Sequence, residues 1–274
     1  MTYKMKDFHC ISGLPRSGST LLAALLSQHP DVHAGMSSPV LDMLETLLVT
    51  MSGRSEYSVF VDDERREKIL RGVAHSYYED VEKPCIVDTN RAWNSQLALL
   101  GRIFPGAKVV ACVRQVPWIL DSIERLVRKN CLQPSLIFNY QTGGNVYSRV
   151  EGLAGANGFV GFSYNSLKEA YFSPEARGRL LLLRYERFTA DPVRAMAVVS
   201  KFLGLSEFQY NLKKISLDCC GFDEKIGMPG LHFVSGPVRP WCERESILPP
   251  DLFQRFTGDA FWEDKNFLPA IGIF

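Results

Sequence analysis

The first apolar run of the chain ends in residues with the types and spacing of a phosphate-binding loop. Gly13 and Gly18 are followed by Ser19 and Thr20, in the order G-x-x-x-x-G-S-T. In nucleotide triphosphatases, a lysine after the second glycine reaches the β- and γ-phosphates, but Ser19 takes that position here. Glycine and serine also occur in such turns as helix caps alone, but Arg16 inside the turn points to an anionic ligand. We expect its backbone N–H groups to bind phosphate without such a lysine.

A second candidate for phosphate binding pairs Arg114 with Ser122. Arg114 ends the apolar run AKVVACVR, and Ser122 lies eight residues later in the segment VPWILDSIERLVRK, which has a helical pattern. The guanidinium group matches phosphate oxygens with two parallel donors, and the serine hydroxyl can bracket the same phosphate. Taken alone, the pair reads as a surface ion-pair partner and a solvated helix residue. The loop before it favours the phosphate interpretation.

Together, the two segments resemble the sulfotransferases that use 3′-phosphoadenosine 5′-phosphosulfate (PAPS). GLPRSGSTLLAALLSQHPDV is similar to their 5′-phosphosulfate loop, and FPGAKVVACVRQVPWILDS is similar to their 3′-phosphate motif. The resemblance implies PAPS as co-substrate and PAP as product, with no metal. It implies that PAPS is bound by Pro15, Arg16, Ser17, Gly18, Ser19, Thr20, Arg114 and Ser122. It also implies that Arg16 meets the oxygen on which charge develops during transfer.

Two later segments resemble the family more loosely. LLRYERFTADP places Tyr185 where the family has a tyrosine near the adenine, although ordinary packing explains Tyr185 equally well. GMPGLHFVSGPVRP resembles the late loop of bacterial members, which closes over the nucleotide, so Ser235 and Gly236 are candidates for the 3′-phosphate, with Arg239 beside them. The loop lacks the Arg-Lys-Gly triplet of the cytosolic enzymes. The resemblance covers residues 8 to 122 well, 180 to 240 loosely and 129 to 178 hardly.

The general base that accepts the proton of the acceptor is not given by the resemblance. Small-molecule sulfotransferases use a histidine in a Lys-Thr-His segment, and Asn90 of VDTNRAW stands in its place. Tyrosylprotein and heparan enzymes use a glutamate soon after the first loop helix, where this chain has GMSSPV. Asp88 is the nearest replacement, a carboxylate expected to end a buried strand and face the cleft, although an N-cap or a salt bridge to Arg91 explains it equally well. His33, in the loop after the first helix, and Glu45, in the next helix, are reserves. The remaining histidines are expected to be packing or surface residues: His9, His29, His75 and His232.

Strands alternate with helices along the chain, which predicts an α/β fold with a central parallel sheet of four or five strands, flanked by helices and P-loop-like. We expect one sulfotransferase domain over residues 1–274. The strand-like runs are residues 7 to 12, 85 to 89, 107 to 114 and 179 to 186, and the clearest helical patterns are residues 62 to 81, 116 to 129 and 191 to 204. Two less regular insertions, 129–178 and 206–248, are expected to form walls or lids at the carboxyl ends of the strands.

Composition restricts the partners. Thirty-one basic and thirty acidic residues leave a net charge of +1, which gives no general reason to expect nucleic acid or an anionic membrane as partner. No segment has the apolar length of a membrane span or signal peptide, so we expect a cytoplasmic protein. The seven cysteines have no C-x-x-C spacing, and Cys10, Cys85 and Cys112 lie in apolar segments, as reduced core thiols do.

The acceptor stays open between two classes. A small natural-product hydroxyl or amine is preferred, because the net charge offers no basic trough for acidic peptides. A protein or peptide tyrosine is the alternative, because the overall pattern resembles the bacterial branch shared with tyrosylprotein sulfotransferases. A P-loop nucleotide kinase and a non-catalytic nucleotide-binding regulator are further alternatives, and the missing lysine counts against the kinase.

Overall fold

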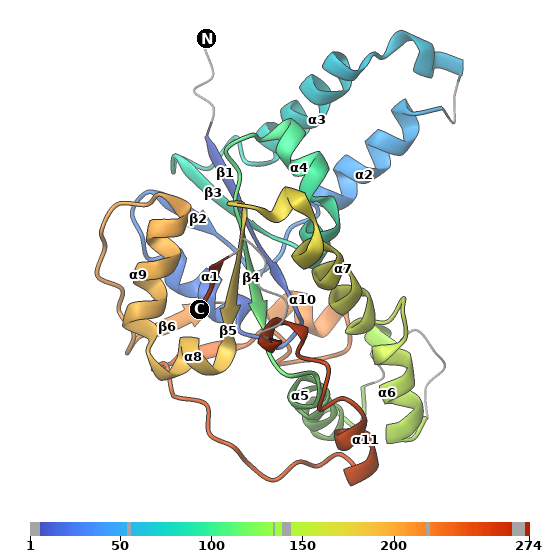
Figure 1. Ribbon diagram of the computed structural model, residues 1–274, viewed down its shortest axis with the longest axis vertical. Helices are drawn as coiled ribbons and strands as arrows, with labels where there is room; N and C mark the ends of the chain where they lie inside the picture. Colours follow the sequence, from blue (N-terminus) through green and yellow to red (C-terminus); the bar gives the residue numbers. More distant parts are fainter. Residues whose placement is uncertain (1–5, 54–55, 134, 139–143, 218–219, 265–271) are drawn as a thin grey trace.

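A parallel sheet forms the centre of the molecule (Figure 1). The computed structural model describes residues 6–53, 56–133, 135–138, 144–217, 220–264 and 272–274. Neighbouring strands pair in parallel in the order β2-β3-β1-β4-β5-β8. Their bounds are β1 (Asp7–Gly13), β2 (Val32–Ala34), β3 (Cys85–Thr89), β4 (Val109–Val113), β5 (Leu180–Arg184) and β8 (Gly272–Ile273). The predicted parallel sheet is confirmed, and the short edge strands β2 and β8 raise its size to six strands.

The central strands are buried on both faces because alternate residues enter two different apolar clusters. In β4, Val109, Ala111 and Val113 pack on one face, and Val110 and Cys112 pack on the other. All five side chains are fully buried. The continuous apolar run of this segment therefore predicts its position correctly.

Three helices cover one face of the sheet: α1 (Ser19–Leu26), α8 (Tyr185–Ala190) and α9 (Pro192–Leu203). The start of α9 is fixed by Asp191, whose side chain accepts a hydrogen bond from the Arg194 backbone N–H at 3.1 Å. Pro192 occupies its first turn, and Gly204 ends it with a φ of +80°. The helical pattern predicted over residues 191 to 204 is therefore confirmed.

The other face is covered by a longer set of helices. They are α2 (Val40–Met51), α3 (Asp63–Tyr77), α4 (Leu97–Ile103), α5 (Val116–Lys129), α6 (Val146–Ala154), α7 (Gly161–Phe172) and α11 (Pro250–Arg255). In Figure 1, α2 and α3 form a hairpin that projects away from the sheet. The 3₁₀ turns are η1 (Glu56–Phe60), η2 (Arg91–Gln96), η3 (Leu136–Phe138), η4 (Pro174–Ala176) and η5 (Phe261–Glu263).

The insertion 129–178 is more regular than its sequence predicts, because it contains α6 and α7. Its glycines hide the helical pattern but are required for packing. A Cβ on Gly158 would lie 2.2 Å from the Gly152 carbonyl oxygen, and a Cβ on Gly161 would lie 2.0 Å from that of Gly155. These small residues allow the end of α6 and the start of α7 to approach closely, and α7 in turn packs against η2.

The insertion 206–248 stays largely irregular, as expected. It contains a short antiparallel pair, β6 (Ile215–Leu217) with β7 (Val234–Gly236), and the helix α10 (Cys220–Lys225). Its end is attached to α5 through Asp121, which is fully buried and accepts hydrogen bonds from the Arg244 side chain and the Ile247 backbone N–H. This attachment keeps the segment beside the carboxyl ends of the strands.

Cys10, Cys85 and Cys112 are free and buried, as the sequence predicts. Within the described residues, no helix has both the length and the apolar character needed to cross a membrane.

Candidate functional site

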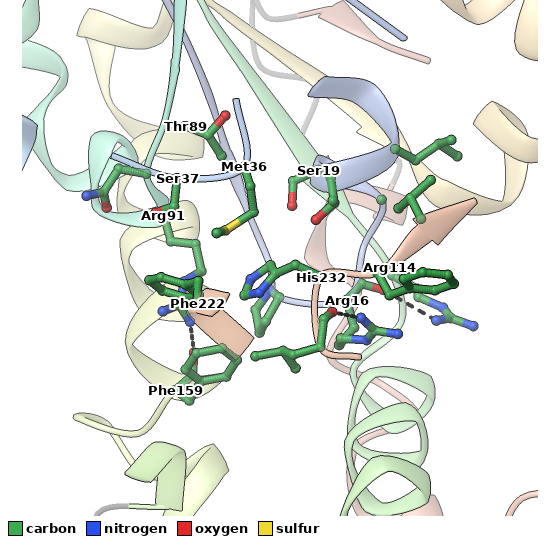
Figure 2. A pocket seen from close by; sticks show the side chains of 18 of the residues that line it. Arg16, Ser19, Met36, Ser37, Thr89, Arg91, Arg114, Phe159, Phe222 and His232 are labelled. Carbon is green, nitrogen blue, oxygen red and sulfur yellow. Dashed lines mark hydrogen bonds between the residues drawn. The ribbon is translucent and has the colours of Figure 1, made fainter. Parts of the chain in front are cut away.

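A cavity of about 1330 Å³ opens at the carboxyl ends of the parallel strands, where ligands bind in open α/β sheets. One end is formed by the loop between β1 and α1, and the other by the segment after β3 and the start of α7. The late residues 231–239 close it from the side. Figure 2 shows the side chains converging on this space. Both insertions contribute walls, as predicted.

The loop between β1 and α1 is built around unusual backbone angles. Gly13 has a φ of +108°, and a Cβ there would lie 2.1 Å from the Cys112 carbonyl oxygen. Arg16 has a φ of +57°, the one positive φ outside glycine among the described residues. Such strain concentrates at functional sites. Gly18 caps α1 with a φ of +96°, and no side chain in the described chain caps this helix. The first-turn N–H groups are therefore left for a ligand.

The Arg16 side chain connects this loop to two other parts of the cavity. Its Nε donates to the Ser122 hydroxyl in α5 at 3.1 Å, and its guanidinium donates to the Leu231 carbonyl in the late segment. Burial, with Arg114 nearby, lowers the pKa of Arg16 to about 10. Arg16 stays charged at neutral pH. Ser122 was predicted to bracket a phosphate with Arg114, but its hydroxyl instead contacts Arg16, and Ser122 does not line the cavity.

A second cation lies beside the loop. Arg114 directly follows β4 and is 6% exposed, and its Nη1 donates to the Arg16 carbonyl at 3.3 Å. Its guanidinium carbon lies 4.6 Å from the Tyr185 ring centroid and 5.9 Å from that of Trp241. Tyr185 also packs against Gly18, where a Cβ would lie 2.9 Å from the Tyr185 ring. The predicted residues Arg114 and Tyr185 thus form one wall with the loop.

Two buried donors at or behind this wall lack a hydrogen-bond partner. The Nε of Arg114 and the Nε1 of Trp241 have no hydrogen bond within the part of the chain that the structure describes. Burial lowers the pKa of Arg114, and the Glu186 carboxylate stays 3.9 Å away. A buried donor without a partner costs free energy, so these atoms are suited to a polar ligand. Trp241 was not among the site residues predicted from the sequence. Its position directly after GPVRP in the late segment is the pattern that could have indicated it.

The predicted cleft-facing orientation of Asp88 is wrong. Its side chain is 1% exposed and does not line the cavity. One carboxylate oxygen accepts from the Tyr78 and Ser38 hydroxyls, and the other accepts from the Trp93 indole at 2.6 Å. Alternation along β3 explains this, since Asp88 shares the face of Ile86, which packs under the helices. Burial still raises the pKa of Asp88, despite its three donors.

Neither alternative for Asp88 is seen either. Asn90, rather than Asp88, caps the turn η2 by accepting from the Ala92 backbone N–H at 3.0 Å. Arg91 instead turns toward Phe159, with its guanidinium carbon 3.7 Å from the ring centroid.

The two reserve candidates for the base lie in different places. His33 is part of β2, not of a loop, and its ring meets Tyr78 edge-on at 5.6 Å, outside the cavity. Burial and the nearby Lys83 lower its pKa. Glu45 lies in α2 on the cavity wall and accepts a hydrogen bond from Gln96 at 2.8 Å. Burial raises the pKa of Glu45. Of the three predicted bases, Glu45 reaches the cavity.

Comparison with known proteins decides the family. A profile described as the sulfotransferase family matches residues 10–209. The chain belongs to the sulfotransferase family. The resemblance drawn from the loop and from the segment ending in Arg114 and Ser122 is thereby confirmed.

The curated relatives are protein-tyrosine sulfotransferases. Protein-tyrosine sulfotransferase 1 of Mus musculus is 28% identical over 111 residues, which cover 38% of this chain and 30% of that protein. Protein-tyrosine sulfotransferase 2 of Gallus gallus is 24% identical over 229 residues, covering 80% of this chain and 55% of that protein. The chain thus spans less than a third of the first relative and about half of the second. A solved sulfotransferase domain from the curacin biosynthetic pathway aligns with 16% identity and a TM-score of 0.48, over 74% of this chain and 75% of that one.

The end of the cavity at η2 and the start of α7, which is far from the loop after β1, was not predicted from the sequence. Aromatic side chains from the two insertions line it: Phe159, Phe162 and Phe222. Arg91 lies among them and donates to the Phe159 carbonyl at 3.1 Å, and burial lowers its pKa to about 10. His232, expected to be a packing or surface residue, lies on the cavity wall. An arginine two residues after a predicted strand, at the edge of the sheet where ligands bind, is the sequence pattern that could have indicated Arg91.

Ser235 and Gly236 in β7, together with Arg239, also line the cavity, as their predicted proximity to a ligand requires. Within the described chain, no group of three or more His, Cys, Asp or Glu side chains is arranged to hold a metal ion.

Proposed function

We propose that this sulfotransferase moves the sulfuryl group of PAPS to a hydroxyl or amine of a small-molecule acceptor. The observation that carries the proposal is the phosphate end of the cavity. There, an uncapped helix start lies beside Arg16 and Arg114, and a buried donor of Arg114 lacks a partner. Two cations and a set of backbone N–H groups in one place favour a ligand with more than one anionic group.

The residues present fit PAPS. The N–H groups of residues 17–20 are suited to the 5′-phosphosulfate, as at other helix starts that bind anions. Arg114, with Ser235 and Gly236 of the late segment, is suited to the 3′-phosphate, and Ser122 holds the Arg16 side chain. Tyr185 and Trp241, which flank the Arg114 guanidinium, offer flat surfaces for the adenine.

PAPS supplies the sulfuryl group. A bond forms between the acceptor oxygen or nitrogen and sulfur, and the bond from sulfur to the 5′-phosphate oxygen breaks. The electron pair stays on that oxygen, PAP leaves, and the acceptor proton passes to a base on the protein. Arg16 is suited to stabilise the charge on the leaving oxygen, because it is charged and held on two sides. The chain's other contribution is to position the two reactants.

The far end of the cavity favours an aromatic or apolar acceptor over an acidic peptide. Phe159, Phe162 and Phe222 provide apolar surface there. Asp42 and Glu45 line the same space and would repel the acidic side chains of a peptide. The tyrosine of a peptide remains the second candidate, because the curated relatives are protein-tyrosine sulfotransferases.

The test is transfer of labelled sulfate from PAPS to a panel of phenols, aliphatic alcohols, amines and tyrosine peptides. We expect product with a phenol or alcohol, and less with acidic peptides. Binding of PAP and ATP, compared by calorimetry, separates the proposal from a nucleotide kinase, and we expect PAP to bind more tightly. PAP binding without any product would favour a nucleotide-binding regulator and would overturn the proposal.

A further inference from the structure

We propose that His232, oriented by Asp223, is the general base of the transfer, an inference that rests on the proposed function. The geometry that carries it is a histidine on the cavity wall whose second ring nitrogen is held by a buried carboxylate. This arrangement appears in many enzymes that take a proton from a hydroxyl. None of the three bases expected from the sequence, Asp88, His33 and Glu45, has such an arrangement.

Asp223 fixes the orientation of His232 with both carboxylate oxygens. One oxygen lies 2.6 Å from Nδ1 of the ring, and the other accepts the His232 backbone N–H at 2.8 Å. The Asp223 side chain is 3% exposed, whereas that of His232 is 22% exposed. Because the carboxylate accepts the Nδ1 proton, the Nε2 lone pair is left as an acceptor. Nε2 has no hydrogen-bond partner among the described residues.

His232 also lies where a base is needed. The carbonyl of Leu231, the residue before it, accepts a hydrogen bond from Arg16, which is suited to the leaving oxygen. Figure 2 shows the ring between Arg16 on one side and Phe222 and Arg91 on the other, below Ser19 and Met36. The Phe222 ring meets the imidazole at 5.5 Å. His232 therefore stands between the phosphate end and the acceptor end of the cavity.

Burial and two nearby cations favour the neutral form of His232. Burial lowers its pKa, Arg16 and Arg91 lower it further, and Asp223 raises it. These groups come from the loop after β1, from η2 and from α10, the elements that face the ring. Since the net direction is below the usual value of about 6.5, the imidazole is unprotonated at neutral pH and can accept a proton. The proton taken from the acceptor goes to Nε2, and Asp223 stabilises the imidazolium that results.

The decisive variant is His232→Asn, because the asparagine amide can still donate to Asp223 but has no nitrogen in the place of Nε2. We expect kcat with an aliphatic alcohol to fall about a hundredfold or more, since general-base catalysis contributes that much. We expect the Kd of PAP to change less than about threefold, since the phosphate contacts lie elsewhere. A phenol of low pKa should lose less, since it needs less help to release its proton. His75→Asn, at a partly buried histidine outside the cavity, is the matched control and should leave kcat unchanged.

Two measurements separate a base from a structural residue. In His232→Gly, added imidazole should restore part of the turnover in proportion to its unprotonated fraction. In Asp223→Asn, the acid limb of kcat against pH should move to lower pH, because a group that raises the pKa of His232 has been lost.

If wild-type protein transfers sulfate, His232→Asn lowers the rates with phenol and alcohol equally, and imidazole restores no turnover in His232→Gly, then His232 is structural and this inference is overturned. If Glu45→Gln instead abolishes turnover while His232→Asn remains active, the base is Glu45 and the inference is again overturned. If wild-type protein transfers no sulfate from PAPS to any acceptor, it is the proposed function that fails, a result distinct from these two.

Discussion

The phosphate end of the cavity takes its two cations and its N–H groups from residues that follow strands, with the late segment beside them, whereas the acceptor end is built mostly from insertions between strands. Arg114 follows β4, Tyr185 follows β5, and the loop of Arg16 follows β1. Phe159, Phe222 and His232 come from the two insertions. A residue at a strand end is positioned by the sheet itself, while a residue in an insertion is positioned by contacts between distant segments. Under the proposed function, this difference means that the end that binds the co-substrate is fixed by the sheet, while the acceptor end can change without changing the sheet.

The largest effect is expected from a substitution that disturbs the contact between the phosphate-end loop and strand β4. Gly13→Ala places a Cβ 2.1 Å from the Cys112 carbonyl oxygen, at a φ of +108°. Because both the clash and the backbone angle are unfavourable, we expect a loss of about 3 kcal/mol or more in unfolding free energy, measured by chemical denaturation. Gly178→Ala is the control, with a φ of +70° and open space around it, and should lose about 1 to 2 kcal/mol. Equal losses in the two variants would mean that the loop is not tied to β4 as described.

The second largest effect is expected on turnover at Arg16. Arg16→Ala should lower kcat about a hundredfold or more, because its charge is most useful as the leaving oxygen becomes negative. The Kd of PAP should change by much less. Ser122→Ala is the matched control, since it removes one partner of Arg16 and leaves the guanidinium in place. Equal losses of turnover and affinity in Arg16→Ala would show that Arg16 binds the ground state only.

The third effect concerns affinity at the same end. Arg114→Ala should raise the Kd of PAP about 10- to 100-fold, because hydrogen bonds to charged groups contribute about 1.5 to 3 kcal/mol. The Kd of PAP for Arg114→Lys should lie between those of Arg114→Ala and the wild type, since lysine keeps the charge but not the paired donors. Calorimetry with PAP measures both. An unchanged Kd in Arg114→Ala would contradict its assignment to the 3′-phosphate.

The same contrast explains which parts could be predicted from the sequence. The loop of Gly13, Gly18 and Thr20, and the pairing of Arg114 with the following helix, are local patterns of glycine, strand end and helix start. They depend on few long-range contacts, so the sequence alone indicates them, although the serine of that helix, Ser122, contacts Arg16 rather than Arg114. The exact helices α5 and α9 were likewise predictable from their apolar period and, in α9, from Asp191 and Gly204.

What could not be predicted depends on side-chain direction and on segments far apart in the chain. Asp88 has the place in the sequence that a base would have, but alternation along β3 directs its side chain under the helices. Which face of β3 a residue occupies is known only from the apolar clusters that its neighbours join, Ile86 in one and Val87 in the other. His232 and Asp223 lie in an irregular segment with no period to mark them. Arg16 meets Leu231 across more than two hundred residues of sequence, and no local pattern records that contact.

The smallest effect on transfer is expected at Asp88, and it tests whether a carboxylate near the strand end takes part in the chemistry. Its oxygens accept from Tyr78, Ser38 and Trp93. In Asp88→Asn, the amide NH₂ replaces one of these oxygens, so two donors face each other in a buried place. We expect a loss of about 1 to 3 kcal/mol in unfolding free energy. Tyr78→Phe removes one of the three donors and should cost less.

Turnover gives the sharper reading of Asp88. A structural carboxylate affects all acceptors alike, so the ratio of kcat for an aliphatic alcohol to kcat for a phenol of low pKa should be the same in Asp88→Asn and the wild type, measured below the unfolding temperature of both. His232→Asn should lower that ratio. If Asp88→Asn lowers the ratio as well, Asp88 assists proton removal, either through Ser38 on the cavity wall or by a movement of β3. The base would then not come from the insertions alone, and the contrast between the two ends of the cavity would no longer hold.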